Sequence, residues 1–220
     1  LAKEKDVEIL IDAEESWMQD AADELCEEMM RLYNTEKPIV YNTLQLYRWD
    51  RLDYLKQLHE RAKRDKFTIG VKIVRGAYME KERDRAEEKG YPSPICATKE
   101  ATDINFNQTL EYILNHLDVI SVFIGTHNEQ SSYLAMELME KFNITKNDNR
   151  VWFGQLYGMS DHISFNLAAQ GYNVAKYVPF GPVKDVMPYL IRRAEENTSV
   201  AGQTSRELNL LKQEKARRKL

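Results

Sequence analysis

The sequence predicts an α/β protein with a parallel sheet, a TIM-like (β/α)8 barrel of which about six βα units are present. Strand-like and helical segments alternate along the 220 residues. The strand-like segments are continuous apolar runs, which is typical of parallel strands buried on both faces. Polar or charged residues follow the carboxyl ends of these runs, where barrel enzymes carry their functional groups.

The composition excludes several classes of protein. The chain is 43% hydrophobic and 30% charged, which predicts a soluble globular protein with a substantial core. Its net charge of −4 gives no basis for nucleic-acid binding. No apolar run approaches the roughly 18 residues that span a membrane, and the charged first residues do not resemble a signal peptide. The spacing of Cys26, Cys96 and the histidines predicts no metal site and no disulfide framework, so we expect reduced, structural cysteines in an intracellular protein.

The first four elements alternate regularly. Residues 7–11 form a short apolar run that stops at an acidic cluster. Residues 17–33 repeat apolar side chains at helical spacing, which predicts an amphipathic helix. Residues 38–45 predict a second strand, and residues 52–64 a second amphipathic helix.

The middle of the chain continues this alternation. Residues 68–74 predict a third strand, which ends at a charged and glycine-containing turn. A charged segment follows at residues 79–90, within which the run 80–89 is typical of a solvated helix face. Residues 102–116 predict a helix, and residues 119–124 predict the fourth strand.

Two further units follow. Residues 131–142 predict a helix, and residues 151–156 predict the fifth strand. Residues 162–170 predict a short helix that stops at Gly171, because glycine adopts the left-handed conformation that often ends helices. Residues 174–178 predict the sixth strand.

The last predicted helix carries the adjacent arginines Arg192 and Arg193. Pro188 would lie in its first turn, where a missing N–H costs nothing. Adjacent helix positions point about 100° apart, but both guanidiniums could converge on one small anion, and their paired donors match a carboxylate. Tyr189 would share their side of the helix, and Glu196 could hold one guanidinium. The alternative is a solvated basic pair on a surface helix.

Two architectures fit parallel strands of this kind, an open doubly wound sheet and a barrel. No glycine-rich phosphate fingerprint follows a strand, which argues against the nucleotide-binding open sheet. A barrel would gather the polar strand ends on one rim. These are Asp12, Gln45, Arg75 with Tyr78, His127, Gln155 and Tyr177.

The number of predicted strands falls short of a closed barrel, and the chain opens on a strand without an initiator methionine. We therefore expect residues 1–204 to be the carboxyl-terminal portion of a larger barrel, followed by a basic helical tail at residues 205–220.

Two strand residues allow more than one interpretation. Lys72 lies within an apolar strand and needs either a polar barrel interior or a buried partner. It could also form a Schiff base, as in a barrel lyase or aldolase that acts on a small carboxylate. Asp12 could simply cap the following helix.

Seven short motifs in these positions, taken together, resemble the proline dehydrogenase family, and they occur in the order that the family has. The motifs are Ile11-Asp12-Ala13-Glu14, Asn42-Thr43-Leu44-Gln45, Val71-Lys72-Ile73-Val74-Arg75-Gly76-Ala77-Tyr78, Gly125-Thr126-His127-Asn128, Phe153-Gly154-Gln155-Leu156-Tyr157-Gly158-Met159, Tyr177-Val178-Pro179 and Tyr189-Leu190-Ile191-Arg192-Arg193-Ala194-Glu195-Glu196-Asn197. The resemblance runs from about residue 7 to residue 198 and is strongest to the eukaryotic-type branch, which also occurs in some bacteria.

The resemblance implies a distorted (β/α)8 barrel that uses FAD to oxidise L-proline to Δ1-pyrroline-5-carboxylate, the first step of proline catabolism. Electrons would pass to a membrane quinone. The location would be cytoplasmic and peripherally membrane-associated in a bacterium, or the mitochondrial inner membrane or matrix in a eukaryote. An incomplete barrel would expose strand edges, so we also expect homo-oligomers, or else a non-catalytic fragment.

The resemblance also implies roles for individual residues. Lys72 would donate toward the flavin N5 edge, and Asp12 would support the arginine cluster. Arg192 and Arg193 would clamp the proline carboxylate. The substrate ring would lie among the aromatic side chains of Tyr78, Tyr177 and Tyr189, with Tyr177 disfavouring a hydroxylated ring. The residues that would line FAD are Ala13, Gln45, Arg75, Gly76, Ala77, Thr126, His127 and Glu196.

Overall fold

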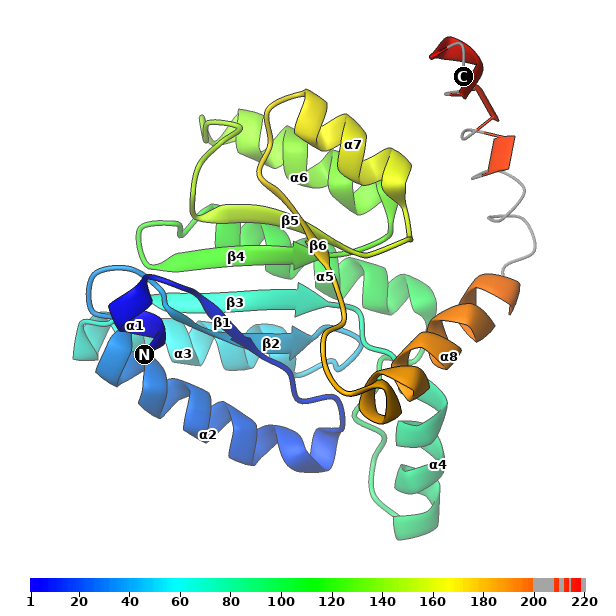
Figure 1. Ribbon diagram of the computed structural model, residues 1–220. Helices are drawn as coiled ribbons and strands as arrows, with labels where there is room; N and C mark the ends of the chain where they lie inside the picture. Colours follow the sequence, from blue (N-terminus) through cyan, green and yellow to red (C-terminus); the bar gives the residue numbers. More distant parts are fainter. Residues whose placement is uncertain (200–207, 210–211, 214, 219–220) are drawn as a thin grey trace.

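The computed structural model describes residues 1–199, 208–209, 212–213 and 215–218. Within them, six parallel strands form one sheet in the order β1-β2-β3-β4-β5-β6. The strands are β1 (Ile9–Ile11), β2 (Val40–Gln45), β3 (Ile69–Val74), β4 (Ile120–Gly125), β5 (Val151–Leu156) and β6 (Val174–Tyr177). Strands that pair in chain order form a barrel wall, because a doubly wound sheet reverses its order. The prediction of part of a (β/α)8 barrel is confirmed (Figure 1).

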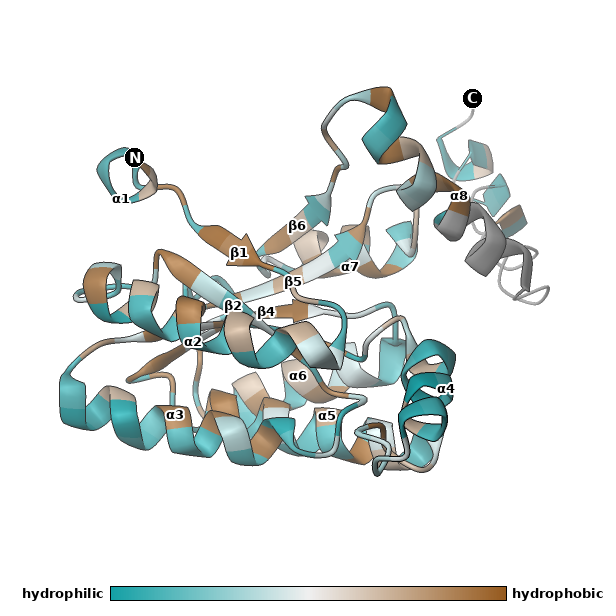
Figure 2. Ribbon diagram, turned by 90° about the horizontal axis from the view of Figure 1, so that it is seen from below, coloured by the Kyte–Doolittle hydropathy of each residue, from teal (hydrophilic) through white to brown (hydrophobic). Residues whose placement is uncertain are grey.

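Helices alternate with the strands, and some of them cover the outer face of the sheet (Figure 2). They are α1 (Ala2–Lys5), α2 (Ser16–Tyr33), α3 (Arg51–Asp65), α4 (Met79–Lys89), α5 (Lys99–Leu114), α6 (Glu129–Lys141), α7 (Asp161–Ala169) and α8 (Val183–Ser199). In Figure 2, α2, α3, α5 and α6 lie together on one side of the strands, so each strand has a helix-facing side and an inner side.

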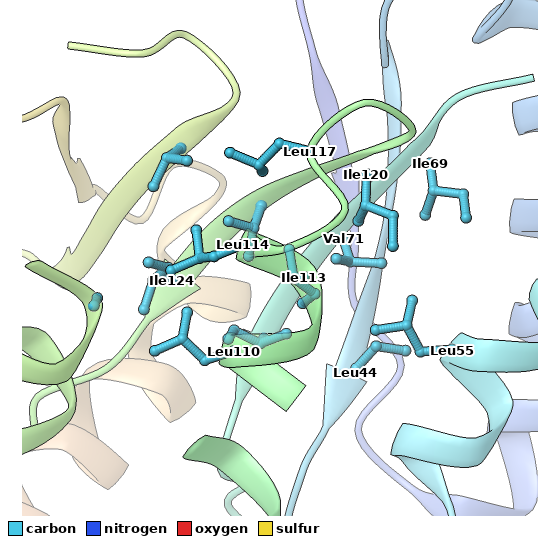
Figure 3. Close-up of a cluster of buried hydrophobic side chains, with 14 of the residues drawn as sticks. Leu44, Leu55, Ile69, Val71, Leu110, Ile113, Leu114, Leu117, Ile120 and Ile124 are labelled. Carbon is cyan, nitrogen blue, oxygen red and sulfur yellow. The ribbon is translucent and has the colours of Figure 1, made fainter. Parts of the chain in front are cut away.

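The core fills the space between the strands and these helices. Side chains alternate along a strand, so Ile69, Val71 and Ile73 of β3 face the helices and are fully buried. Figure 3 shows β3 residues in the same cluster as Leu55 of α3 and Leu110 of α5. Burying a side chain of this size contributes about 1.5–3 kcal/mol, so this layer anchors the sheet that carries the inner face.

The inner face is set by the strand register. Thr43 of β2 is the register neighbour of Lys72 of β3, which in turn neighbours Phe123 of β4. Gly154 of β5 leaves room for the Phe123 ring, because a Cβ at Gly154 would lie 2.0 Å from a ring carbon. The inner face therefore places a lysine between a hydroxyl side chain and an aromatic side chain.

Two elements differ from the prediction. Helix α5 begins three residues before the predicted start, because Thr98 caps it by accepting a hydrogen bond from the Ala101 amide at 3.1 Å. Helix α8 begins at Val183, so the prediction that Pro188 lies in the first turn is wrong. The amides of Asp185 and Val186 bond to the Pro182 carbonyl and start the helix earlier than the proline suggests.

The predicted tail at residues 205–220 lies partly outside the described residues. Its described residues 208–209, 212–213 and 215–217 are helical, and the division at residue 204 stays a prediction. In the described part of the chain, no helix combines the length and the apolar character that a membrane crossing requires.

Cys26 and Cys96 are buried and form no disulfide. Burial, together with the nearby Asp23 carboxylate, raises the pKa of the Cys26 thiol to about 11. The thiol therefore stays protonated in neutral solution and packs as a small apolar side chain.

Candidate active site

A lysine and an aspartate face each other at the carboxyl ends of β1 and β3. Asp12 follows β1, and its Oδ1 lies 2.6 Å from the Lys72 Nζ. The Thr43 hydroxyl of β2 donates to the same oxygen at 2.5 Å. The N-cap of α2 is Glu15, so the alternative that Asp12 caps this helix is wrong. Side chains from the ends of three adjacent strands thus form one charged cluster, Asp12 with Lys72 and Thr43, on the inner face.

The loop after β1 is joined to the ends of β2 and β3. The Gln45 amide donates to the Ala13 carbonyl at 3.0 Å. The Tyr78 hydroxyl donates to the Glu14 carboxylate at 2.5 Å. Ala13, Gln45 and Tyr78, which were expected to belong to one site, therefore do lie around one loop.

The turn after β3 requires glycine. Gly76 has φ +97°, in the left-handed region, and a Cβ there would lie 2.5 Å from Tyr47 ring carbons. Gly76 and Ala77 are both exposed, so the backbone at this turn is open to a bound molecule.

Arg75 connects the ends of β3 and β4 to the outer helices. Its guanidinium bonds to Asp103 at 2.7 Å, to the Thr126 hydroxyl at 3.1 Å and to the Ser131 hydroxyl at 2.8 Å. It also lies 4.2 Å from the centre of the Phe106 ring. Burial alone would raise the pKa of Asp103, but hydrogen bonds from Lys99 and Arg75 outweigh it and hold this pKa below its ordinary value.

The sequence did not indicate Asp103 or Ser131 as part of this cluster. Each lies on a helix with no local pattern that would separate it from ordinary surface polar residues. Only the fold brings them to Arg75.

His127, which follows β4, lies in a positively charged setting. Its Nδ1 is 2.9 Å from the Ser160 hydroxyl. Burial, together with the positive charges of Lys176 and Arg193, lowers the pKa of His127 to about 4. His127 is therefore neutral at physiological pH, and Arg193 of α8 lies near enough to act on it.

Helix α8 lies beyond the carboxyl ends of the strands in both ribbon views (Figures 1 and 2). The rings of Tyr177 and Tyr189 are 5.6 Å apart, and the Arg193 guanidinium is 5.2 Å from the centre of the Tyr189 ring. The side chains of Arg192 and Glu196 lie outside the described part of the chain. The end of β6 and α8 thus form a second cluster, two aromatic rings and one guanidinium, on the same side of the sheet as Lys72.

Gln155, another predicted strand-end residue, faces the helices. Its amide donates to the Thr126 carbonyl at 3.2 Å and accepts from the Ser164 hydroxyl at 2.8 Å. A hollow of about 470 Å³ near Leu117 and Arg150 lies at the opposite, amino-terminal end of the strands. It contains none of the candidate residues. Within the described residues, no three side chains of the metal-binding types form a group that could hold an ion.

The fold and the site together define the class of protein: a parallel barrel whose charged and aromatic groups gather at the carboxyl ends of its strands, as in barrel enzymes. The family model for proline dehydrogenase matches residues 1–206. The chain therefore belongs to the proline dehydrogenase family, a family of oxidoreductases of proline catabolism.

Individual relatives agree with this assignment. The chain is 44% identical over 220 residues to "Proline dehydrogenase 1, mitochondrial" of Homo sapiens, covering 99% of this chain and 37% of that protein. It is 40% identical over 219 residues to the "Carbapenem antibiotics biosynthesis protein CarD" of Pectobacterium carotovorum subsp. carotovorum, covering 99% of this chain and 55% of that protein.

Among solved structures, proline utilization A (PutA) from Bdellovibrio bacteriovorus, inactivated by N-propargylglycine, matches with a TM-score of 0.83 and 30% identity. The match covers 91% of this chain and 21% of the PutA chain. The chain thus corresponds to a part of the length of each of these relatives.

Proposed function

We propose that this chain supplies the carboxyl-terminal part of a catalytic barrel that oxidises L-proline to Δ1-pyrroline-5-carboxylate with FAD, and that electrons pass on to a membrane quinone. The observation that carries the proposal is the Asp12–Lys72 pair on the inner face, on the same side of the sheet as the Tyr177–Tyr189–Arg193 cluster. Family membership supports the same reaction.

The residues at the strand ends fit a flavin. The exposed Gly76–Ala77 turn has almost no side-chain bulk, so a planar ring or a phosphate can approach the backbone. Neutral His127, near two cations, suits an anionic group. The proposed FAD-binding residues are Ala13, Gln45, Arg75, Gly76, Ala77, Thr126, His127 and Glu196. When bound, FAD supplies the two-electron acceptor that the oxidation of an amine requires.

Lys72 would contribute electrostatically. Its ammonium is oriented by the Asp12 carboxylate, and its side chain is 17% exposed. A cation fixed in this setting stabilises negative charge that develops during the reaction without having to reorganise. Asp12, held by both Lys72 and Thr43, would keep the local charge balanced.

The substrate would be held at its two ends. Arg192 and Arg193 would bind the proline carboxylate, because guanidinium forks match its oxygens. Tyr78, Tyr177 and Tyr189 would fix the plane of the ring, and Tyr177 would disfavour a hydroxylated ring. Positioning of this kind accounts for much of the rate of a reaction between two bound groups.

The Lys72–Asp12 pair disfavours the alternative of a Schiff-base lyase. A carbonyl is attacked by the lone pair of a neutral amine, whereas an ion-paired ammonium offers none. If borohydride with a small keto acid were to trap an adduct on Lys72, the lyase interpretation would replace the oxidase.

The test is spectroscopic. We expect the purified protein to absorb between roughly 350 and 500 nm as a flavoprotein, and L-proline without oxygen to bleach this band. D-Proline is the matched control, since its carboxylate and ring are the same but its geometry is inverted. A protein that holds FAD and is not bleached by L-proline refutes the substrate, and one that cannot hold FAD favours a non-catalytic fragment. Reduction of a soluble quinone in the presence of L-proline tests the acceptor.

The sheet edges support a proposal about assembly. Within the described residues, β1 pairs only with β2 and β6 only with β5. Ile9 of β1 is 45% exposed and Val178, just after β6, is 59% exposed. Open parallel edges with apolar neighbours tend to pair, so we propose homo-oligomers through these edges. Light scattering tests this proposal, and a monomer at high protein concentration contradicts it.

The cellular location that we propose depends on whether the protein comes from a bacterium or a eukaryote. We propose a cytoplasmic, peripherally membrane-associated protein if the source is bacterial, and the mitochondrial inner membrane or matrix if it is eukaryotic. The human relative is named as mitochondrial. Fractionation of source cells, with detection by an antibody, tests the proposal.

A further inference from the structure

Three consecutive residues at the end of the β1–α2 loop and the first position of α2, Glu14 to Ser16, bind the start of α4. Glu14 accepts from the Tyr78 hydroxyl at 2.5 Å, and Glu15 accepts from Lys81 at 2.9 Å. The third contact is double, because the backbone amide and the hydroxyl of Ser16 each donate to the Glu82 carboxylate at 2.6 Å. The order of these three residues along the chain is the order of their partners Tyr78, Lys81 and Glu82 at the start of α4.

The backbone of this loop is itself held in place. The Ala13 carbonyl accepts from the Gln45 side chain at 3.0 Å, and the Glu14 carbonyl accepts from the Tyr47 hydroxyl at 3.3 Å. Tyr47 is almost fully buried. Glu14 therefore projects from a backbone that the end of β2 fixes, although its own side chain is exposed.

The ring of Tyr78 is fixed at two points. Glu14 holds its hydroxyl, and the Lys81 ammonium lies 5.2 Å from its ring centre. Glu82, which is fully buried, holds the helix that begins directly after Tyr78. An aromatic side chain held at its hydroxyl and on one face presents its remaining face in a constant direction.

We propose that Glu14 is a positioning residue, which sets the orientation of Tyr78 at the substrate site. The inference rests on the proposed function, in which Tyr78 is one of the aromatic residues around the substrate ring. Glu14 touches neither substrate nor flavin in this scheme and acts only through Tyr78. Its loss should weaken substrate binding and leave the chemical step, which depends on Lys72, nearly unchanged.

The experiment compares Glu14→Ala, Glu14→Gln and Tyr78→Phe in the flavin-loaded protein, with Glu88→Ala as the matched control. Glu88 is an exposed carboxylate in the last turn of α4, and its partner is Lys89 at 2.7 Å rather than Tyr78 or Lys81. We expect KM for L-proline to rise about three- to ten-fold in Glu14→Ala and in Tyr78→Phe, with kcat within two-fold. Glu14→Gln keeps an acceptor oxygen and should recover most of the loss. The double variant Glu14→Ala/Tyr78→Phe should be no worse than either single variant, because both remove the same hydrogen bond.

A second readout does not depend on activity. Ring-labelled tyrosine gives an NMR resonance for Tyr78, assigned by its absence in Tyr78→Phe. This resonance should shift in Glu14→Ala and stay in place in Glu88→Ala. An additive double variant, or a Tyr78 resonance that ignores Glu14, overturns the inference. If the parent protein does not oxidise L-proline, the proposed function fails, and the resonance alone then decides whether Glu14 holds Tyr78.

Discussion

Replacing Lys72 with methionine gives the sharpest test of the proposed chemistry. The substitution keeps most of the aliphatic volume and removes the ammonium that lies 2.6 Å from Asp12. Removing one preorganised group that stabilises developing charge lowers kcat by about 10²–10³, which corresponds to about 2.7–4 kcal/mol. We therefore expect a loss of this size in kcat, with a much smaller change in KM.

The cost in stability should be small by comparison. Asp12 is 44% exposed and keeps its hydrogen bond from Thr43, so the unpaired carboxylate stays partly solvated. Breaking a partly exposed pair costs about 1 kcal/mol or less. Thermal unfolding should therefore separate a catalytic loss from a folding defect.

The assay is the rate of flavin bleaching by L-proline in a stopped-flow instrument without oxygen. Lys141→Met is the matched control, since Lys141 also forms an ion pair, with Glu111, but on the outer helices. Lys72→Arg keeps the positive charge and should recover part of the rate. A Lys72→Met protein with kcat within three-fold of the parent and an unchanged melting temperature would refute the electrostatic role of Lys72.

Three further outcomes follow from the packing and charge of the site. Gly154→Ala places a Cβ 2.0 Å from a Phe123 ring carbon. It should destabilise the protein by about 1–3 kcal/mol in urea unfolding, with partial recovery in Gly154→Ala/Phe123→Leu. Burial lowers the pKa of His127 from 6.5 to about 4, so the unfolded state binds a proton first as the pH falls. Stability should thus be constant above pH 6.5 and fall between pH 6.5 and 4, by at most about 1.4 kcal/mol per pH unit, and His127→Asn should flatten that fall in pH-dependent unfolding. Glu82→Ala leaves the partly buried amide and hydroxyl of Ser16 without their acceptor and should cost about 1–3 kcal/mol in thermal unfolding, whereas Glu80→Ala, at an exposed position of the same helix, should be nearly neutral.

The strands were predictable because strands such as β3 and β4 are short, largely apolar runs. An apolar run bounded by polar residues fixes a buried parallel strand to within one or two residues, as residues 151–156 show without any error. Helix starts were less predictable. The cap at Thr98 and the turn at Pro182 depend on one or two local hydrogen bonds each, which hydrophobic spacing does not encode.

The sequence indicated individual candidate residues, but it did not indicate which residues would contact one another. Lys72 needed a partner, and the sequence indicated that need because an ammonium does not stay alone in an apolar strand. That the partner would be Asp12, 60 positions away, follows only from the fold. The same holds for Arg75 with Asp103 and Ser131, where ordinary helix residues become ligands of a guanidinium.

The register of the sheet explains why the Asp12–Lys72–Thr43 group forms at all. Ile11 of β1 pairs with Asn42 of β2, and Thr43 pairs with Lys72, so the residue after Ile11 meets both polar groups at one level. A slip of one residue in β2 would turn Leu44 inward and Thr43 toward the helices, because side chains alternate between the two faces. Leu44 is fully buried in the outer core, and its burial opposes such a slip. The apolar core between the sheet and the helices therefore fixes the position of the Asp12–Lys72–Thr43 group on the inner face. Substitutions at Leu44 should change the Lys72–Asp12 distance before they unfold the chain.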